Sequence, residues 1–176
     1  MNRAGQTAAG GDYRLRFAEE RDAPLVLEFV RALAEYEGLL DQVQATEEGL
    51  RRYIFEEKRA EVIFCDHRPG AGSDFQPAGF ALFFHNFSTF AGKPGLYIED
   101  LFVKPALRGR GYGKALLSAV ARVAAERNCG RLEWACLDWN EPSIAFYKSR
   151  GARPLDEWTV YRLTGEALRT LGGPAR

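Results

Sequence analysis

A glycine-rich turn with basic neighbours is the stretch of this sequence best suited to hold an anion. Arg108–Lys114 reads RGRGYGK, with three glycines and three basic residues, and it stands where a helix is expected to begin. Glycine has no Cβ, so backbone N–H groups here can approach a ligand closely. Helix N-termini also favour phosphate groups. The turn therefore predicts a pyrophosphate-binding site.

Two familiar nucleotide motifs do not fit this turn. A dinucleotide-binding GxGxxG follows its strand directly. Here the spacing is GxGxG, and Lys104–Arg108 intervenes between Val103 and Gly109. A P-loop needs GxxxxGK[ST], but Ala115 replaces the hydroxyl residue and Arg108 the first glycine. The remaining alternative is a structural turn with solvated arginines.

Two adjacent carboxylates interrupt the apolar segment that precedes the turn. Glu99 and Asp100 lie within Leu96–Val103, which is expected to be a strand. Alternation predicts opposite faces, with Glu99 beside Tyr97 and Leu101 and Asp100 among the even-numbered residues. Carboxylates are rarely buried unless they are paired or functional. A carboxylate in such a strand can bind a cation or accept a proton, so Glu99 is predicted to be functional. The role of Asp100 stays open.

The elements around these residues predict an α/β fold, with a mixed sheet covered by helices. Pro24 favours a helix start and Gly38 a helix stop. Thr46 opens the second helix. The predicted helices are 23–37, one from 46, 111–128, 142–150 and a turn or two at 165–171. The predicted strands are 13–18, 61–65, 78–84, 96–103, 131–137 and 159–163.

Composition indicates one globular domain and excludes several kinds of partner. The 176 residues carry 24 basic and 24 acidic side chains, so a global nucleic-acid or membrane-surface role is not expected. No apolar run is long enough to span a membrane. Three scattered cysteines and two histidines argue against a metal site and favour a cytoplasmic location. Residues 1–12 are predicted to be a disordered tail, and 13–171 the domain.

Several motifs together resemble one enzyme family. RGRGYG resembles the R/Q-x-x-G-x-G/A pyrophosphate motif of the GNAT superfamily of acyl-CoA-dependent N-acetyltransferases, and DWNEPSIAFYKSRGA at 138–152 resembles its second block. LAEYE at 33–37, QV at 42–43 and YIEDLFV at 97–103 are similar to the diamine (spermidine/spermine) and thialysine acetyltransferases. The resemblance spans about residues 14–171. It implies a single GNAT-type domain with a mixed, mostly antiparallel sheet flanked by helices.

This resemblance implies acetyl-CoA as co-substrate and assigns residues to it. The pantetheine amides would contact the backbone of Leu101, Phe102 and Val103. The pyrophosphate would be held by Arg108, Gly109, Arg110, Gly111, Tyr112, Gly113 and Lys114. The cofactor site would be completed by Asn140, Glu141, Pro142, Ser143 and Arg150.

The resemblance also implies an amine site and a proton donor. The amine would be lined by Tyr36, Glu37, Glu99, Glu133, Trp134 and Ala135. Glu99 would also act as general base, because an ammonium must lose a proton before it attacks. Tyr147 would protonate the departing thiolate. Each has a structural alternative: Tyr147 as a core aromatic on a different face from Phe146, Asn140 as a helix N-cap, and Glu37 as a solvated helix end.

The expected activity is direct transfer of an acetyl group to a primary amine of a small cationic substrate, a diamine or a lysine-like amino acid. Diamine acetyltransferases carry a Glu-Gly-Trp patch where this chain reads WTVYR at 158–162, which leaves a polyamine preference open. The alternatives are a protein-lysine acetyltransferase and a catalytically silent acyl-CoA-binding sensor. A homodimer is implied by the resemblance alone.

Overall fold

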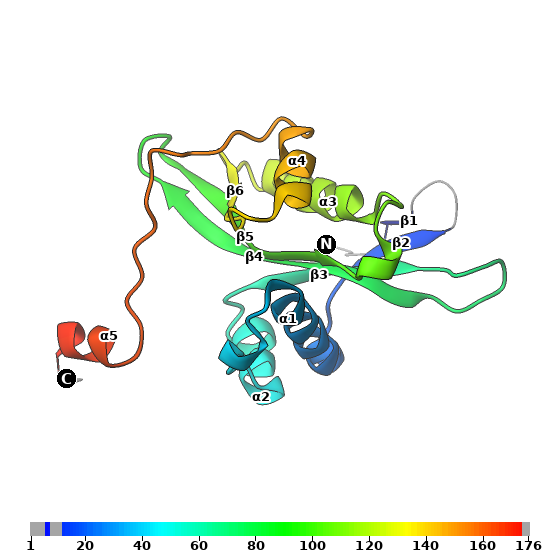
Figure 1. Ribbon diagram of the computed structural model, residues 1–176, viewed down its shortest axis with the longest axis horizontal. Coiled ribbons are helices and arrows are strands. Elements are labelled where there is room, and N and C mark those ends of the chain that lie inside the picture. Colours follow the sequence, from blue (N-terminus) through cyan, green and yellow to red (C-terminus); the bar gives the residue numbers. More distant parts are fainter. Residues whose placement is uncertain (1–5, 8–11, 174–176) are drawn as a thin grey trace. The chain divides into compact units, whose positions relative to one another are not determined.

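The computed structural model describes residues 6–7 and 12–173, and its strands form one sheet in chain order, β1 to β6 (Figure 1). Neighbouring strands are antiparallel except for the parallel pair β5–β6. The mixed, mostly antiparallel α/β fold is thereby confirmed. The strands are β1 (Gln6–Thr7), β2 (Tyr13–Phe17), β3 (Glu61–His67), β4 (Gln76–Ser88), β5 (Lys93–Val103) and β6 (Leu132–Trp134).

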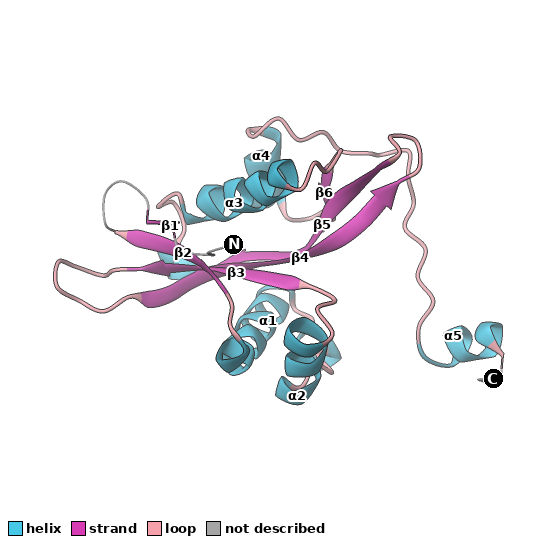
Figure 2. Ribbon diagram, turned by 180° about the vertical axis from the view of Figure 1, so that it is seen from behind, coloured by secondary structure: helices cyan, strands magenta, loops and turns pink. Residues whose placement is uncertain are grey.

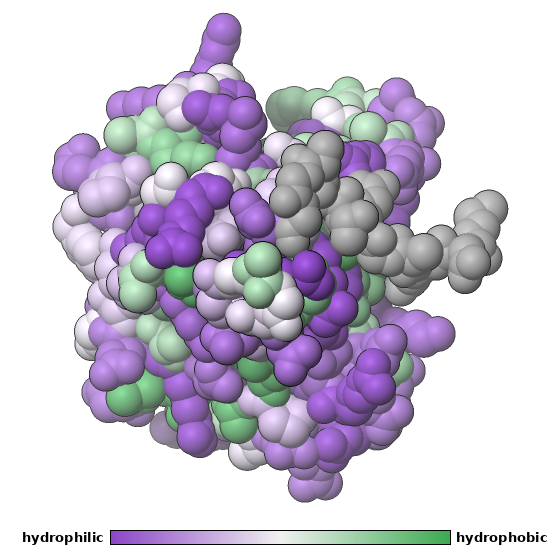
Figure 3. All heavy atoms as spheres, turned by 90° about the vertical axis from the view of Figure 1, so that its right-hand side faces the viewer, coloured by the Kyte–Doolittle hydropathy of each residue, from purple (hydrophilic) through white to green (hydrophobic). Residues whose placement is uncertain are grey.

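The chain divides into two compact units, Met1–Ala135 and Cys136–Arg176. The sheet belongs to the first unit. Residues 1–5 and 8–11 of the predicted tail lie outside the described residues, whereas Gln6–Thr7 pairs with Leu15 and Arg14 of β2. None of the helices in the described ranges is long and apolar enough to cross a membrane. Hydrophilic side chains predominate on the face drawn in Figure 3, with hydrophobic ones scattered between them.

Helix α1 (Ala23–Glu37) begins and ends where the sequence predicts. Pro24 occupies its first turn, where a missing N–H costs little. Gly38 adopts the left-handed conformation at φ 73° and donates its N–H to the carbonyls of Ala34 and Glu35. The next helix, α2 (Glu47–Leu50), is capped by Thr46, whose hydroxyl accepts from the Gly49 N–H at 3.1 Å. It continues as a π-helix over Arg51–Glu56.

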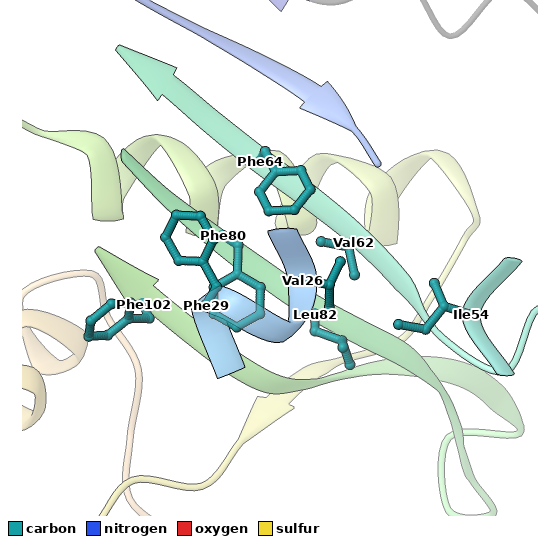
Figure 4. Packing of buried hydrophobic residues seen from close by; sticks show 8 residues of the cluster. All are labelled: Val26, Phe29, Ile54, Val62, Phe64, Phe80, Leu82 and Phe102. Atoms are coloured by element: carbon teal, nitrogen blue, oxygen red, sulfur yellow. The ribbon is translucent and has the colours of Figure 1, made fainter. Parts of the chain in front are cut away.

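Figures 1 and 2 show α1 and α2 on one face of the sheet and α3 (Tyr112–Glu126) on the other. On the α1 face, Phe29 is fully buried, with its ring 5.2 Å from Phe80 and 5.7 Å from Phe64 (Figure 4). Removing such a ring costs about 3–5 kcal/mol. The rest of this cluster comprises Val26, Ile54, Val62, Leu82 and Phe102. The cluster fixes the end of α1 against β5.

Helix α3 approaches the sheet closely at a glycine. A Cβ on Gly79 would lie 2.6 Å from the Phe102 carbonyl oxygen and 3.2 Å from Leu116 Cδ1. Gly79 therefore lets α3 pack directly over β4 and β5. Leu116 and Val120 are fully buried there. This packing sets the position of the helix N-terminus relative to the end of β5.

The second unit holds α4 (Glu141–Lys148) and α5 (Gly165–Gly172). Two strand predictions need correction. Leu132–Trp134 forms β6, so the predicted strand 131–137 is shorter, and Thr159–Leu163 is not a strand. The second segment contains Thr159, Val160 and Tyr161, which are common in strands, but it pairs with no strand in the described part of the chain. Val160 and Tyr161 are 81% and 91% exposed, so no burial favours an extended pairing there.

Candidate active site

One edge of β5 is left open where the sequence predicts contacts to a cofactor. Strand β6 pairs with Leu96–Ile98 of β5 and then ends, while β5 continues to Val103. On this side Glu99–Val103 has no partner strand among the described residues. Backbone N–H and C=O groups along such an edge can pair with an added extended chain. Leu101, Phe102 and Val103 can therefore bind the amides of an elongated ligand.

The turn after β5 ends in a helix start without a capping side chain. Gly109 and Gly111 have φ values of 77° and 85°, which favour glycine, and Gly111 is the N-cap of α3. The first helical hydrogen bond runs from the Ala115 N–H to the Gly111 carbonyl at 2.9 Å. The N–H groups before it have no acceptor within the helix. This helix end can therefore bind an anion.

Charge at this end of α3 points the same way. The first turn contains Lys114 and no acidic residue, although a helix N-terminus carries partial positive charge. Arg110, just before the helix, is exposed. The His67 ring lies 6.0 Å from the ring of Tyr112, the first residue of α3. Burial, with smaller effects from Arg110 and Lys104, lowers the pKa of His67. Positive charge collected on a positive helix end is stabilised when an anion binds.

Two side chains of the turn contribute to packing. Tyr112 is 5% exposed, and its ring lies 5.6 Å from Tyr13 and 6.0 Å from His67, so only its backbone can face a ligand. The Arg108 guanidinium lies 4.2 Å from the Tyr36 ring, and its Nε donates to the Val103 carbonyl at 3.1 Å. Arg108 thereby joins the turn, the end of β5 and the end of α1.

The C-terminal end of α1 collects negative charge. Glu37 is its last residue, and the last turn contains no basic side chain. Burial raises the pKa of Glu37. The Tyr36 ring lies 6.2 Å from Phe102 of β5. Since the C-terminus of a helix carries partial negative charge, Tyr36 and Glu37 lie where a cation is stabilised.

A β-bulge reorders β5 at the two carboxylates and corrects the predicted alternation. Asp100 lies opposite Leu82 and Ile98 opposite Phe83, so Glu99 is an extra residue with no partner on β4. Glu99 is exposed rather than buried within the apolar strand. The extra residue also shifts which face each side chain takes before the bulge. Tyr97, opposite Phe84, lies on the same face as Asp100 and not on the predicted opposite one. The pattern of one strand cannot reveal this, because a bulge depends on its pairing partner.

Asp100 is the carboxyl whose environment is most unusual. It shares the α1 face with Leu82 and Phe102, which belong to the core cluster. Burial, followed by the charges of Glu99 and Glu37, raises the pKa of Asp100 to about 7. Strongly shifted groups gather at functional sites. The sequence predicts Asp100 within an apolar strand, but it does not reveal that Glu37 of α1 lies near it.

The residues predicted at β6 lie beside the paired part of β5. Glu133 lies opposite Tyr97 and is held by Asn86 Nδ2 and Arg131 Nε, each at 2.8 Å from its Oε2. Trp134 lies opposite Ile98, and Ala135 follows the strand and is exposed. The Glu133 carboxylate is therefore already bound to two neighbours.

The other predicted site residues lie in the second unit. Asn140 is 6% exposed, and its Oδ1 accepts from the Ser143 N–H at 3.3 Å, which confirms it as the N-cap of α4. Pro142 and Glu141 occupy the first turn, where both are favourable. The half-buried Tyr147 was predicted on a different face from Phe146, yet their rings lie in contact at 5.3 Å. Arg150 is exposed, and its Nε donates to Ser149 Oγ.

Comparison with known proteins identifies the family. The profile of the acetyltransferase (GNAT) family matches residues 28–152, which include every predicted site residue. Thialysine N-epsilon-acetyltransferase of Bos taurus is 39% identical, over 90% of this chain and 96% of its own. L-ornithine N5-acetyltransferase of Arabidopsis thaliana is 32% identical, over 90% and 87%. The chain therefore belongs to the GNAT acetyltransferase family, and family membership implies an acyl-CoA co-substrate.

Solved structures share the fold. An integron cassette protein from the mobile metagenome of V. cholerae superimposes with a TM-score of 0.74 at 28% identity, over 94% of this chain and 100% of its own. An aminoglycoside acetyltransferase from an uncultured soil sample superimposes with a TM-score of 0.72 at 17% identity, over 88% and 99%. The second likeness supports the fold alone.

Proposed function

We propose that this protein transfers an acetyl group from acetyl-CoA directly to the primary amine of a small cationic substrate, a lysine-like amino acid or a diamine. The observation that carries the proposal is the set of carboxyls at the end of α1 and in β5: Glu37, Glu99 and Asp100. Opposite charges attract strongly where water is partly excluded, so this set favours an ammonium group. Relatives named for thialysine and ornithine acetylation support a lysine-like substrate.

The residues of the first unit fit the co-substrate. When bound, acetyl-CoA supplies the thioester whose acetyl group is transferred. The open edge at Leu101–Val103 would bind the amides of its pantetheine arm. The N-terminus of α3, with Arg110 and Lys114, would hold its pyrophosphate. An N–H of the same edge would stabilise negative charge on the thioester oxygen during attack.

The family motif in which the remaining residues stand supports their proposed roles. Glu99 would bind the amine, and either Glu99 or the adjacent Asp100 would accept the amine proton. Tyr36 and Glu37 would line the same site. Tyr147 would protonate the thiolate. The reaction would then include two proton transfers, one from the amine and one to the sulfur. Asn140–Ser143 and Arg150 would complete the cofactor site.

A thiol-release assay tests the proposed function. Acetyl-CoA is offered with thialysine, ornithine, lysine, spermidine, an aminoglycoside and a lysine-containing peptide in parallel. The expected result is stoichiometric release of coenzyme A with one of the small cationic amines and slow release with the peptide. Fastest turnover with the peptide would favour a protein-lysine acetyltransferase. Binding of acetyl-CoA without acetylation of any amine would favour the silent sensor.

Two further features of the proposal concern the assembly and its location. A homodimer is proposed from the family resemblance, and light scattering behind a sizing column measures it directly. A cytoplasmic location is proposed because the sequence has only three scattered cysteines. A monomeric mass at working concentration would contradict the first point.

A further inference from the structure

The β-bulge divides two neighbouring carboxyls between different surroundings. Glu99, the extra residue, is exposed. Asp100 faces α1 beside Leu82 and Phe102, which are 9% and 3% exposed. A carboxyl next to buried apolar side chains loses hydration, and its charged form is disfavoured. The two groups therefore differ in solvation although they are adjacent in the chain.

The charges that act on Asp100 are negative. Glu37 faces it from α1 and Glu99 from its own strand, while β4 contributes the apolar Leu82. The Arg108 guanidinium lies over the rings of Tyr36 and Phe102 and donates to the Val103 carbonyl. Burial and these two carboxylates raise the pKa of Asp100 to about 7. Asp100 can thus take up and release a proton at neutral pH, as an efficient base requires.

We propose that Asp100 is a proton acceptor in the acetyl transfer: it takes the proton that the ammonium substrate must lose, directly or through one water molecule, while the exposed Glu99 binds the amine. This inference rests on the proposed function. One N–H bond of the ammonium breaks as an O–H bond forms on Asp100. The nitrogen keeps the electron pair and uses it to form the bond to the acetyl carbon, while the carbon–sulfur bond of the thioester breaks and the sulfur leaves with its electron pair. The second proton of the nitrogen balances protonation of the sulfur, and Asp100 then releases its proton to solvent.

The two carboxyls predict different defects. Asp100→Asn should lose the acidic limb of the pH profile of kcat/KM, and the rate above pH 7 should fall about 10²-fold. Glu99→Gln should raise the KM for the amine and keep that acidic limb near pH 7. Asp74→Asn, which removes an exposed carboxylate in the β3–β4 loop, is the matched control and should behave like the unmodified protein.

The experiment combines a titration without substrates and a pH–rate profile. Carbon-detected NMR of the aspartate side chains follows Asp100 in the unmodified protein, with the resonance identified by its absence in Asp100→Asn. If that variant does not fold, Asp100→Glu keeps a carboxyl and identifies the resonance by its changed shift. The expected result is an Asp100 midpoint near pH 7 that coincides with the acidic limb of kcat/KM. Calorimetry should give the same affinity for coenzyme A in all variants.

Different results would contradict the acetyl transfer itself and the role of Asp100 in it. If the unmodified protein acetylates no amine at any pH, the proposed function is wrong, and the role of Asp100 is wrong with it. If the protein is active but Asp100 titrates near its ordinary value, the inference alone is overturned. An Asp100→Asn variant that keeps the acidic limb and a rate within about twofold of the unmodified enzyme overturns it as well.

Discussion

The C-terminus of α1 and the N-terminus of α3 each carry a side chain whose charge has the same sign as that helix end, negative at α1 and positive at α3. At the end of α1, Glu37 adds negative charge to the negative end of a helix, and no basic residue stands in the last turn. At the start of α3, Lys114 adds positive charge to a positive end, and no acidic residue stands in the first turn. Ordinary helices place the compensating charge at each end. The start of α3 therefore gains when a ligand brings an anion. The end of α1, where the Arg108 guanidinium already lies against Tyr36, gains when a ligand brings a further cation.

Arg108 links the C-terminus of α1, the end of β5 and the turn before α3. Its guanidinium lies against the Tyr36 ring of α1, while its backbone begins the turn that leads into α3. Its Nε also holds the Val103 carbonyl at the end of β5. The strand between the two helix ends carries Glu99 and Asp100 as well as the open edge. A two-substrate enzyme needs this arrangement, because amine and thioester must meet between their binding sites.

The largest effect is expected where neither charged end is altered. Tyr147→Phe removes one hydroxyl and keeps the ring against Phe146. If Tyr147 protonates the thiolate, kcat should fall by about 10²–10⁴-fold while affinities for both substrates stay nearly constant. Stopped-flow kinetics, calorimetry and the melting temperature are measured on one preparation. Full kcat in a folded Tyr147→Phe would show that the hydroxyl has no part in catalysis.

Charge reversal at the start of α3 should weaken the proposed anion site. Lys114→Glu places an anion on the helix end that is proposed to hold the pyrophosphate, so coenzyme A affinity should fall on the order of 10–100-fold. Calorimetry with coenzyme A measures the change. Arg122→Glu, an exposed position on the same helix two turns later, is the control. Equal affinity in the two variants would contradict the anion site.

Removing the Glu37 charge at the end of α1 should weaken the proposed amine site. Glu37→Gln removes one carboxylate from the proposed amine site, so the KM for the amine should rise about three- to tenfold with coenzyme A affinity unchanged. Steady-state kinetics with ornithine or thialysine provides the test. Glu35→Gln is a matched control because Glu35 is exposed in the same helical turn. The same rise in both variants would mean that only the general charge of the helix end matters.

The smallest effect concerns stability. The pKa of Asp100 is about 7 in the folded protein against an ordinary 3.8. Between these values the folded protein keeps a proton that the unfolded chain has released, so this contribution to stability is lost as the pH rises through 7. Asn cannot ionise. Asp100→Asn should therefore melt a few degrees higher than the unmodified protein at pH 8 and show little difference at pH 4. A pH-independent difference in melting temperature would contradict the shifted pKa.

How much of this could be predicted depends on whether the determinants are local. Pro24 and Gly38 mark the ends of α1, and the sequence predicts its range, 23–37, as the structure has it. The glycines before α3 likewise predict a helix start, because positive φ favours glycine. Asn140 is recognisable as a cap because its side-chain oxygen can accept from an N–H of the first helical turn. Each of these depends on neighbours within a few residues.

Features that depend on distant partners could not be predicted. The bulge at Glu99 is defined by pairing with Leu82 and Phe83, and the open edge by where β6 ends. Asp100 owes its raised pKa first to burial, then to Glu99 and then to Glu37, and Glu37 lies more than sixty residues earlier. Thr159–Leu163 contains residue types that favour strands, but residue type supplies no pairing partner.

The most direct test of the two oppositely charged ends is the ratio of kcat/KM for 1,5-diaminopentane to that for 1-aminopentane, measured with saturating acetyl-CoA. The two amines share the reacting group and the chain length and differ in one positive charge. We predict a ratio of about tenfold or more in the unmodified protein, which falls toward one in Glu37→Gln. A ratio near one in the unmodified protein, or a ratio that Glu37→Gln leaves unchanged, would contradict the assignment of the α1 end to a cationic substrate.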